Sequence, residues 1–189
     1  MTLFINACVR KDSRTKMLAD RLLERINDEL QEVKLEDVRF PISDEEFLNK
    51  RDSLIFNREF DNPIFDLANQ FAKADRIVLA APYWDMSFPA SVKLYFEHIN
   101  VRGITFEYTD KGVPVGLCKA KQLIYISTSG GPHSSRDYGF GYVKALSQVF
   151  YGIKDVRLVM AEGLDVYGAN QKAIMDKAFN EIDNLEIIL

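Results

Sequence analysis

The stretch Leu3-Phe4-Ile5-Asn6-Ala7, followed by Cys8-Val9-Arg10-Lys11-Asp12-Ser13-Arg14-Thr15, decides the fold of this chain. Its first five residues form a short, mostly apolar run, which is typical of a strand buried on both faces of a parallel sheet. The polar turn leads into an amphipathic segment in which Leu18, Leu22 and Ile26 recur every four positions, as in a helix. A strand, a polar turn and a helix in this order predict the first unit of an α/β protein.

The rest of the chain continues this alternation. Further strands are predicted at 33–38, 76–81, 122–127 and 156–161, and further helices at 61–75, 87–102, 138–151 and 170–185. Asp61 is expected to cap the helix that contains Pro63, and a short β excursion is expected at 104–112. The segment 41–60 lacks a clean period and is expected to be partly helical. The pattern predicts a doubly wound parallel sheet of five strands with helices on both faces, in one domain over residues 1–189.

The composition excludes several classes of protein. The chain has 189 residues, of which 47% are hydrophobic, and this is enough for one domain with a substantial core. The net charge is -4, and the 24 Lys and Arg form no basic run, so we expect no nucleic-acid partner. Cys8 and Cys118 have no partners at metal-ligand spacing, so neither a disulfide framework nor a metal site is expected. No window approaches a membrane span, and we expect a cytoplasmic protein without a membrane partner.

The turn before the first helix has the composition of a phosphate site. A helix N-terminus offers unpaired backbone N–H groups and a partial positive charge. The hydroxyls of Ser13 and Thr15, with the guanidinium of Arg10 or Arg14, would complete such a site. The chain contains no Gly-Lys-Ser/Thr and no Gly-x-Gly-x-x-Gly, so a monophosphate fits better than a triphosphate or a dinucleotide. The alternative is that Ser13 only caps the helix and the arginines are solvated.

A second candidate segment, Pro82-Tyr83-Trp84-Asp85-Met86, directly follows a predicted buried strand. Aromatic rings and a thioether suit the two sides of a flat heteroaromatic ligand. Backbone N–H groups of this loop would also reach the edge of such a ring, so Asp85 need not act through its carboxylate. The alternative is a packed surface loop, and exposed aromatic residues also mark protein interfaces.

A third candidate segment, Ser127-Thr128-Ser129-Gly130-Gly131, follows the fourth predicted strand and precedes His133. Its glycines let the backbone approach a ligand closely, and its hydroxyls suit the polar edge of a ring. His133 is a candidate catalytic residue, although a single histidine is more often structural or solvated. A phosphate turn, an aromatic loop and a glycine loop in this order resemble a site for flavin mononucleotide (FMN), because the carboxyl ends of parallel strands meet at one edge.

Over nearly its whole length the chain resembles the FMN-dependent NADH:quinone oxidoreductase and azoreductase family. The most specific segments are Ala80-Ala81-Pro82, Gly103-Ile104-Thr105-Phe106 and Gly130-Gly131-x-His133. The resemblance implies a flavodoxin-like sheet with strand order 2-1-3-4-5 and a homodimer with two FMN sites at its interface. It assigns phosphate contacts to Ser13, Arg14 and Thr15, ring contacts to Pro82 through Met86, and pyrimidine contacts to Thr128 through Gly131.

The resemblance also implies an activity. Hydride equivalents would pass from NADH or NADPH to FMN and then, in ping-pong order, to quinones, azo compounds or nitro compounds. Asp85 stands where many azoreductases have Asn, and Ser129 stands where they often have Arg, so the substrate range stays open.

Three alternatives to this activity remain. The chain could be a flavodoxin-type electron carrier or a flavin-bound regulatory protein, neither of which would turn over NADH with a range of acceptors. A hydrolase would use Ser129, His133 and Asp137, but the nucleophile pattern Gly-x-Ser-x-Gly is absent and the three residues are too local to presume a triad.

Overall fold

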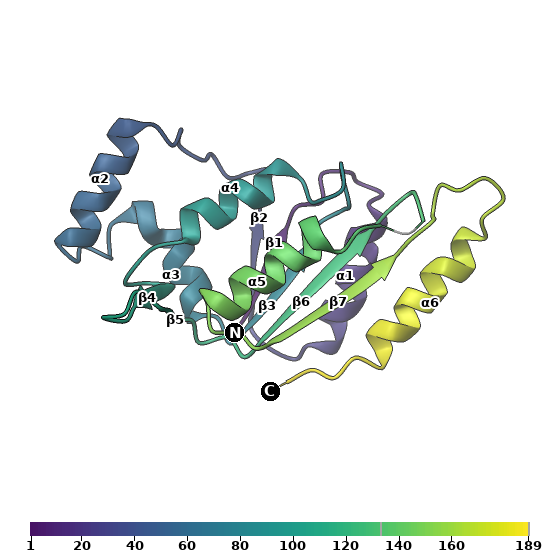
Figure 1. Cartoon of the computed structure of the whole chain (residues 1–189). Coiled ribbons are helices and arrows are strands. Elements are labelled where there is room, and N and C mark those ends of the chain that lie inside the picture. Colours follow the sequence, from purple (N-terminus) through teal and green to yellow (C-terminus); the bar gives the residue numbers. More distant parts are fainter. Residues whose placement is uncertain (133, 189) are drawn as a thin grey trace.

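A computed structural model describes residues 1–132 and 134–188. The central sheet has five parallel strands, in the order β2-β1-β3-β6-β7 (Figure 1). These strands are β1 (Thr2–Asn6), β2 (Leu30–Lys34), β3 (Arg76–Ala80), β6 (Gln122–Thr128) and β7 (Asp155–Ala161). If only the strands of this sheet are numbered along the chain, the spatial order is 2-1-3-4-5. The predicted flavodoxin-like topology is therefore confirmed.

Helices cover both faces of the sheet. One face packs against α1 (Arg14–Arg25) and α6 (Gln171–Asp183), and the other against α3 (Asp66–Lys73), α4 (Ala90–Ile99) and α5 (Tyr142–Val149) (Figure 1). Leu3 and Ile5 of β1 point into the second layer, whereas Phe4 between them points into the first. This two-sided burial explains why the inner strands read as continuous apolar runs rather than alternating ones.

The second strand lies earlier in the sequence than predicted. The prediction was 33–38, whereas β2 covers Leu30–Lys34 and pairs with β1 over its full length, from Thr2 opposite Leu30 onwards. Only Val33 in β2 is buried, so hydropathy carries little information there and pairing with the five-residue β1 sets the span of the strand. The predicted position at the sheet edge is confirmed.

The predicted cap of the helix after residue 60 was wrong by one residue. Asn62, not Asp61, accepts a hydrogen bond from the backbone N–H of Ile64 at 3.2 Å. A 3₁₀ turn over Pro63–Phe65 then leads into α3. Asn62 lies immediately before the turn, which brings its side chain within reach of the N–H groups that the turn leaves free.

The segment 41–60 is partly helical, as predicted, and contains α2 (Glu45–Phe56). Asp44 caps this helix by accepting a hydrogen bond from the N–H of Phe47 at 2.9 Å. None of the residues of α2 is buried, and Figure 1 shows the helix standing apart from the sheet. One side of α2 is partly covered, because the ring centroids of Phe47 and His98 lie 5.5 Å apart and Leu54 and Ile55 pack against the core.

A short hairpin and a π-helical turn lie between the main elements. The predicted β excursion is an antiparallel hairpin of β4 (Phe106–Tyr108) and β5 (Pro114–Gly116). The helix predicted at 138–151 begins as a π-helical turn over Asp137–Gly141 before α5.

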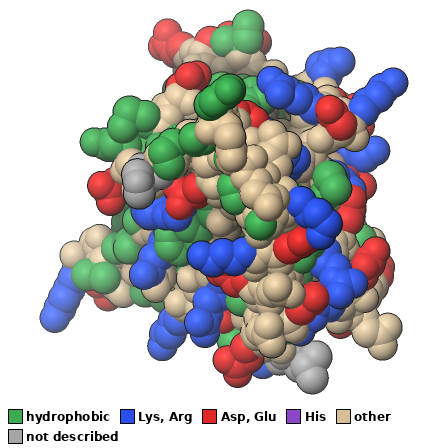
Figure 2. Space-filling model, turned by 90° about the vertical axis from the view of Figure 1, so that its right-hand side faces the viewer, with side chains coloured by type: hydrophobic (Ala, Val, Ile, Leu, Met, Phe, Trp, Pro, Cys, Tyr) green, Lys and Arg blue, Asp and Glu red, His purple; other side chains and the backbone are tan. Residues whose placement is uncertain are grey.

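Charged side chains of both signs are mixed over the α6 side of the molecule. Figure 2 shows Lys and Arg interspersed with Asp and Glu there, with no block of one sign. Among the helices of the described residues, none has the length and hydropathy needed to cross a membrane.

Candidate functional site

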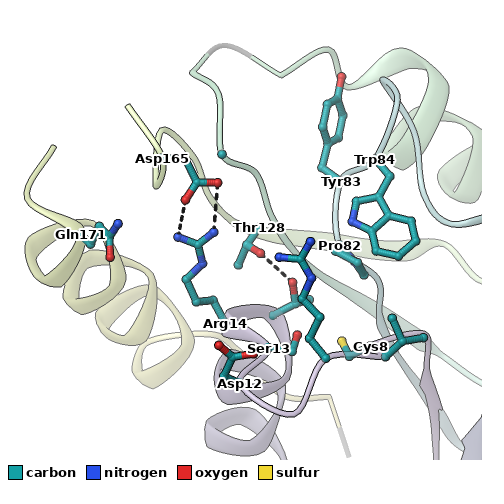
Figure 3. A pocket seen from close by; sticks show the side chains of 14 residues that line it. Cys8, Asp12, Ser13, Arg14, Pro82, Tyr83, Trp84, Thr128, Asp165 and Gln171 are labelled. Atoms are coloured by element: carbon teal, nitrogen blue, oxygen red, sulfur yellow. Dashed lines mark hydrogen bonds and ion pairs between the residues drawn. The ribbon is translucent and has the colours of Figure 1, made fainter. Parts of the chain in front are cut away.

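A cleft of about 510 Å³ opens at the carboxyl ends of β1, β3 and β6. Its walls come from residues within 8–15, 82–84 and 128–130, together with Asp165 and Gln171 (Figure 3). The three segments singled out in the sequence therefore meet at one site. In a doubly wound sheet this position, beside the point where strand order reverses, is where ligands usually bind, and the volume is in the range of small-molecule sites.

The start of α1 forms the floor of the cleft at one end. Ser13 caps the helix, because its Oγ accepts a hydrogen bond from the N–H of Lys16 at 3.2 Å. Helix geometry leaves the preceding N–H groups of Arg14 and Thr15 without intrahelical partners. Arg10 also lines the cleft. The capping role and the phosphate role predicted for Ser13 are thus compatible, since the cap satisfies Lys16 and leaves the first two donors free.

The Thr15 hydroxyl, predicted as a phosphate contact, lies at the floor of the cleft and is engaged within the chain. It is buried and shares a hydrogen bond of 2.7 Å with the hydroxyl of Thr128 (Figure 3). This bond ties the first turn of α1 to the end of β6. Thr15 therefore helps to fix the shape of the cleft floor, and its backbone N–H, in the first turn of α1, has no intrahelical partner.

The aromatic loop after β3 forms the opposite wall. Pro82, Tyr83 and Trp84 line the cleft, and the N–H of Tyr83 donates to the carbonyl of Thr128 at 3.0 Å. Figure 3 shows Trp84 and Pro82 across the cleft from Arg14. The indole ring of Trp84 therefore lies on the side of the cleft opposite the Arg14 guanidinium and the N-terminus of α1.

Asp85 and Met86 lie at the tip of this loop and do not line the cleft. The backbone groups of Trp84 and Ser87 exchange two hydrogen bonds, of 2.9 and 2.8 Å. Asp85 and Met86 between them have φ angles of 48° and 69°. Two central residues with positive φ define a type I′ turn, which normally favours Asn and Gly. The loop therefore holds strained backbone at the rim of the cleft.

The glycine loop after β6 contributes Thr128 and Gly130 to the cleft. Ser127 and Ser129 are buried beneath the surface, and Gly131 is exposed. The Ser129 hydroxyl donates to the carbonyl of Gly131 and accepts from the hydroxyl of Ser134, both at 2.8 Å. The proposed hydrolase nucleophile is therefore engaged inside its own loop.

The candidate catalytic residue His133 lies outside the described residues. No group of three or more His, Cys, Asp or Glu that could bind a metal occurs in the described part of the chain.

Sequence reasoning missed Asp165. This residue follows β7, and its carboxylate accepts two hydrogen bonds from the guanidinium of Arg14, at 2.9 and 3.2 Å (Figure 3). The hydrogen bond from Arg14 holds the pKa of Asp165 below its ordinary value. Its position in the sequence could have pointed to the site, because every loop that follows a parallel strand emerges at the same edge of the sheet.

The sequence comparison decides the family. The family profile described as Flavodoxin-like fold matches residues 1–185. This chain belongs to the flavodoxin-like family.

Two flavodoxin-like relatives illustrate the similarity. An FMN-dependent NADH:quinone oxidoreductase of Clostridium beijerinckii is 35% identical over 182 residues, which cover 93% of this chain and 91% of that protein. An FMN-dependent NADH:quinone oxidoreductase 2 of Clostridium perfringens (strain 13 / Type A) is 39% identical over 127 residues, covering 66% of this chain and 63% of that protein.

Solved structures of the flavodoxin-like fold agree. An azoreductase from Bacillus anthracis str. Sterne has a TM-score of 0.83 at 24% identity, over 96% of this chain and 95% of that chain, which shows the shared fold. An FMN-dependent NADH-azoreductase from Bacillus anthracis str. Ames Ancestor, solved in complex with FMN, has a TM-score of 0.80 at 25% identity, over 96% and 95% of the two chains.

The donors in the cleft of this flavodoxin-like protein suit FMN. The free N–H groups at the start of α1, with Arg10 and Arg14, suit a phosphate. Trp84 suits the flat ring, and Gly130 also lines the cleft.

Proposed function

We propose that this protein is an FMN-dependent oxidoreductase that uses NADH to reduce quinones and azo compounds. The observation that carries the proposal is the convergence of three loops on one cleft, with phosphate-binding groups at one end and an aromatic wall at the other. Relatives whose names specify FMN, NADH and quinones or azo compounds align over more than nine-tenths of the chain, which supports the same chemistry here.

In this proposal the residues of the chain bind FMN and orient it. The start of α1, with Ser13, Arg10 and Arg14, would hold the phosphate, and Pro82, Tyr83 and Trp84 would flank the ring, with Asp85 and Met86 at the rim of the cleft. The loop from Ser127 to Gly131 would meet the polar edge of the ring through its backbone. When bound, FMN supplies the capacity to accept two electrons from a nicotinamide and to pass them on.

The overall reaction balances without a further protein oxidant. One NADH and one proton reduce a quinone to a hydroquinone, and two NADH with two protons cleave one azo bond to two amines. A single cleft that serves both donor and acceptor favours a ping-pong order, in which NAD⁺ leaves before the acceptor enters. We infer that acceptor choice depends on the shape of the cleft mouth near Asp85 and Met86.

The experiment is a spectroscopic titration. Protein reconstituted with FMN and desalted should keep the oxidised-flavin absorbance near about 450 nm, and NADH added without oxygen should bleach it. Steady NADH oxidation with quinones and azo dyes would then separate an enzyme from an electron carrier or a regulatory protein. Failure to retain flavin would contradict the proposal, and parallel lines in initial-rate plots would support the ping-pong order.

A matched pair of variants tests the aromatic wall. Trp84→Ala should weaken FMN binding roughly two- to tenfold, because a stacking surface is removed. Tyr108→Ala removes a similarly exposed aromatic side chain on β4, which does not line the cleft, and should leave FMN binding unchanged. Equal effects of the two variants would contradict the role given to Trp84.

We also propose that the protein acts in the cytoplasm as a homodimer. Its two cysteines are free, which suits a reducing compartment. The helix α2 has no buried residue. Two large apolar side chains near it are also exposed, Ile42 before it at 79% and Phe56 at its end at 89%. Apolar side chains exposed in this way favour a surface that a second copy covers.

A further inference from the structure

An ion pair crosses the phosphate end of the cleft. Asp165 and Arg14 are 151 positions apart in the sequence, and their side chains meet end-on in a bidentate pair (Figure 3). The two Nη groups of Arg14 are engaged by the two carboxylate oxygens of Asp165. This fork is the face of a guanidinium that binds a phosphate most strongly.

The backbone holds Asp165 in this position. The N–H of Asp165 donates to the carbonyl of Gly130 at 2.9 Å, and the N–H of Gly163 donates to the carbonyl of Gly131 at 2.9 Å. A β-carbon added to Gly130 would lie 2.3 Å from Oδ2 of Asp165. The missing side chain of Gly130 therefore makes room for the Asp165 carboxylate.

The charges that line the cleft balance without a ligand. Arg10 and Arg14 contribute two positive charges, and Asp12 and Asp165 contribute two negative ones. The carboxylate of Asp165 also experiences the charge of Arg10. A dianionic phosphate thus enters a site whose formal charges already cancel and in which Arg14 is already paired.

We propose that Asp165 is a placeholder anion that occupies Arg14 in the cofactor-free protein and must release it to the phosphate of the cofactor. Asp165 thereby sets the affinity for FMN and the preference for FMN over riboflavin, which has the same ring and no phosphate. This inference rests on the proposed FMN site and adds a specificity-determining residue to it.

The experiment compares the flavin affinities of variants of the 189-residue chain by quenching of flavin fluorescence. Asp165→Asn keeps the size of the side chain and removes its charge, so Arg14 is freed. The variant should bind FMN roughly two- to fivefold more tightly than the wild type, which is the range expected for loss of an exposed competing ion pair. Its affinity for riboflavin should be unchanged.

Asp183→Asn is the matched control. Asp183 forms the same kind of bidentate pair with Arg21, at 2.8 and 3.0 Å, between α1 and α6 and away from the cleft. Both variants should lower the melting temperature of the cofactor-free protein by similar small amounts. Only Asp165→Asn should change the affinity for FMN.

A double-mutant cycle tests whether the effect passes through Arg14. In an Arg14→Ala background, Asp165→Asn should lose most of its effect on FMN affinity. A gain that persists in that background would show simple repulsion between Asp165 and phosphate, and would overturn the proposal. Weaker FMN binding by Asp165→Asn, or an equal change for riboflavin, would also overturn it, because Asp165 would then contact the bound flavin.

Failure of the proposed function gives a different result. If the wild type binds no FMN, both proposals fall together. If it binds FMN but does not oxidise NADH, the proposed activity fails, and the affinity ratios still decide the role of Asp165.

Discussion

Gly130 has a structural role that its neighbours in the sequence do not indicate, because its missing side chain makes room for Asp165. The sequence predicted that this glycine lets backbone approach a ligand, and the structure shows in addition that the Asp165 carboxylate occupies the space where its side chain would be. Gly131, its neighbour, faces open space. The two glycines are therefore not equivalent, although the sequence presents them as a pair.

A titration of Asp165 tests this difference. Gly130→Ala should raise the pKa of Asp165 toward its ordinary value, because the added methyl group displaces the carboxylate from Arg14. Gly131→Ala should leave that pKa low. Carbon-detected NMR of the carboxyl group against pH measures both.

The same titration has a consequence for stability. Because the pKa of Asp165 is lowered in the folded protein, its pairing with Arg14 stabilises the fold above the ordinary pKa of about 4 and is lost as the pH falls through the folded value. The stability difference between wild type and Gly130→Ala should shrink in that acidic range. A difference independent of pH would mean that the methyl group acts by crowding alone.

The two thiols should be inert in the native protein. Burial raises the pKa of Cys118 to about 12 and also raises that of Cys8. Since the thiolate is the reactive form, about one Cys118 in ten thousand is reactive at pH 8. Ellman's reagent should therefore detect both thiols quickly in denaturant and only slowly in buffer. Rapid reaction of the native protein would contradict the raised pKa values of the two thiols.

Among the elements, the turn after β3 carries backbone strain that a substitution should relieve. Met86 has a φ of 69° and a side chain that is 56% exposed, so Met86→Gly removes little packing. It should stabilise the protein by up to about 1 kcal/mol, because glycine adopts this conformation without steric cost.

The control makes the same substitution in a helix. Met17 in α1 has a similar exposure, 52%, and Met17→Gly should destabilise by about 1 kcal/mol. Urea denaturation measures both variants. Destabilisation by Met86→Gly would show that the side chain packs against something essential at the rim.

The β4–β5 hairpin depends on one close approach. A β-carbon on Gly116 in β5 would lie 2.1 Å from the backbone nitrogen of Gly152 and 2.2 Å from the carbonyl carbon of Tyr151. Because both neighbours are backbone, Gly116→Ala should destabilise by roughly 1–3 kcal/mol or more, measured by urea denaturation. Gly131→Ala serves as the control and should have almost no effect, since that glycine faces open space.

At the scale of the whole molecule, the exposed apolar residues around α2 lead to a prediction about assembly. Light scattering should give a mass near twice the 21.7 kDa of one chain. Phe56→Ser should shift the protein toward the monomer, because an exposed phenylalanine at an interface would bury a large apolar area. Met17→Ser, on the α1 side of the sheet, should leave the mass unchanged. A monomeric wild type would contradict the proposed homodimer.

Much of the architecture followed from local patterns. Four of the five sheet strands are predicted within about one residue, because inner strands buried on both faces produce apolar runs that stand out. β2 was misplaced because an edge strand with one buried side chain takes its limits from its partner.

The sequence by itself determined the alternation of strands and helices and the three loops that meet at the carboxyl edge of the sheet, since apolar periodicity and the order of polar turns are local properties of the chain. The strand order and the family were indicated by the resemblance to known proteins. Only the tertiary structure showed that Thr15 binds Thr128, that Ser129 is engaged within its loop and that Asp165 holds Arg14. These pairs join residues through folded geometry, and a bidentate ion pair between positions 151 residues apart leaves no periodic signal in either segment. The partners of each polar group were decided by the convergence of strand ends, which packing of the core creates.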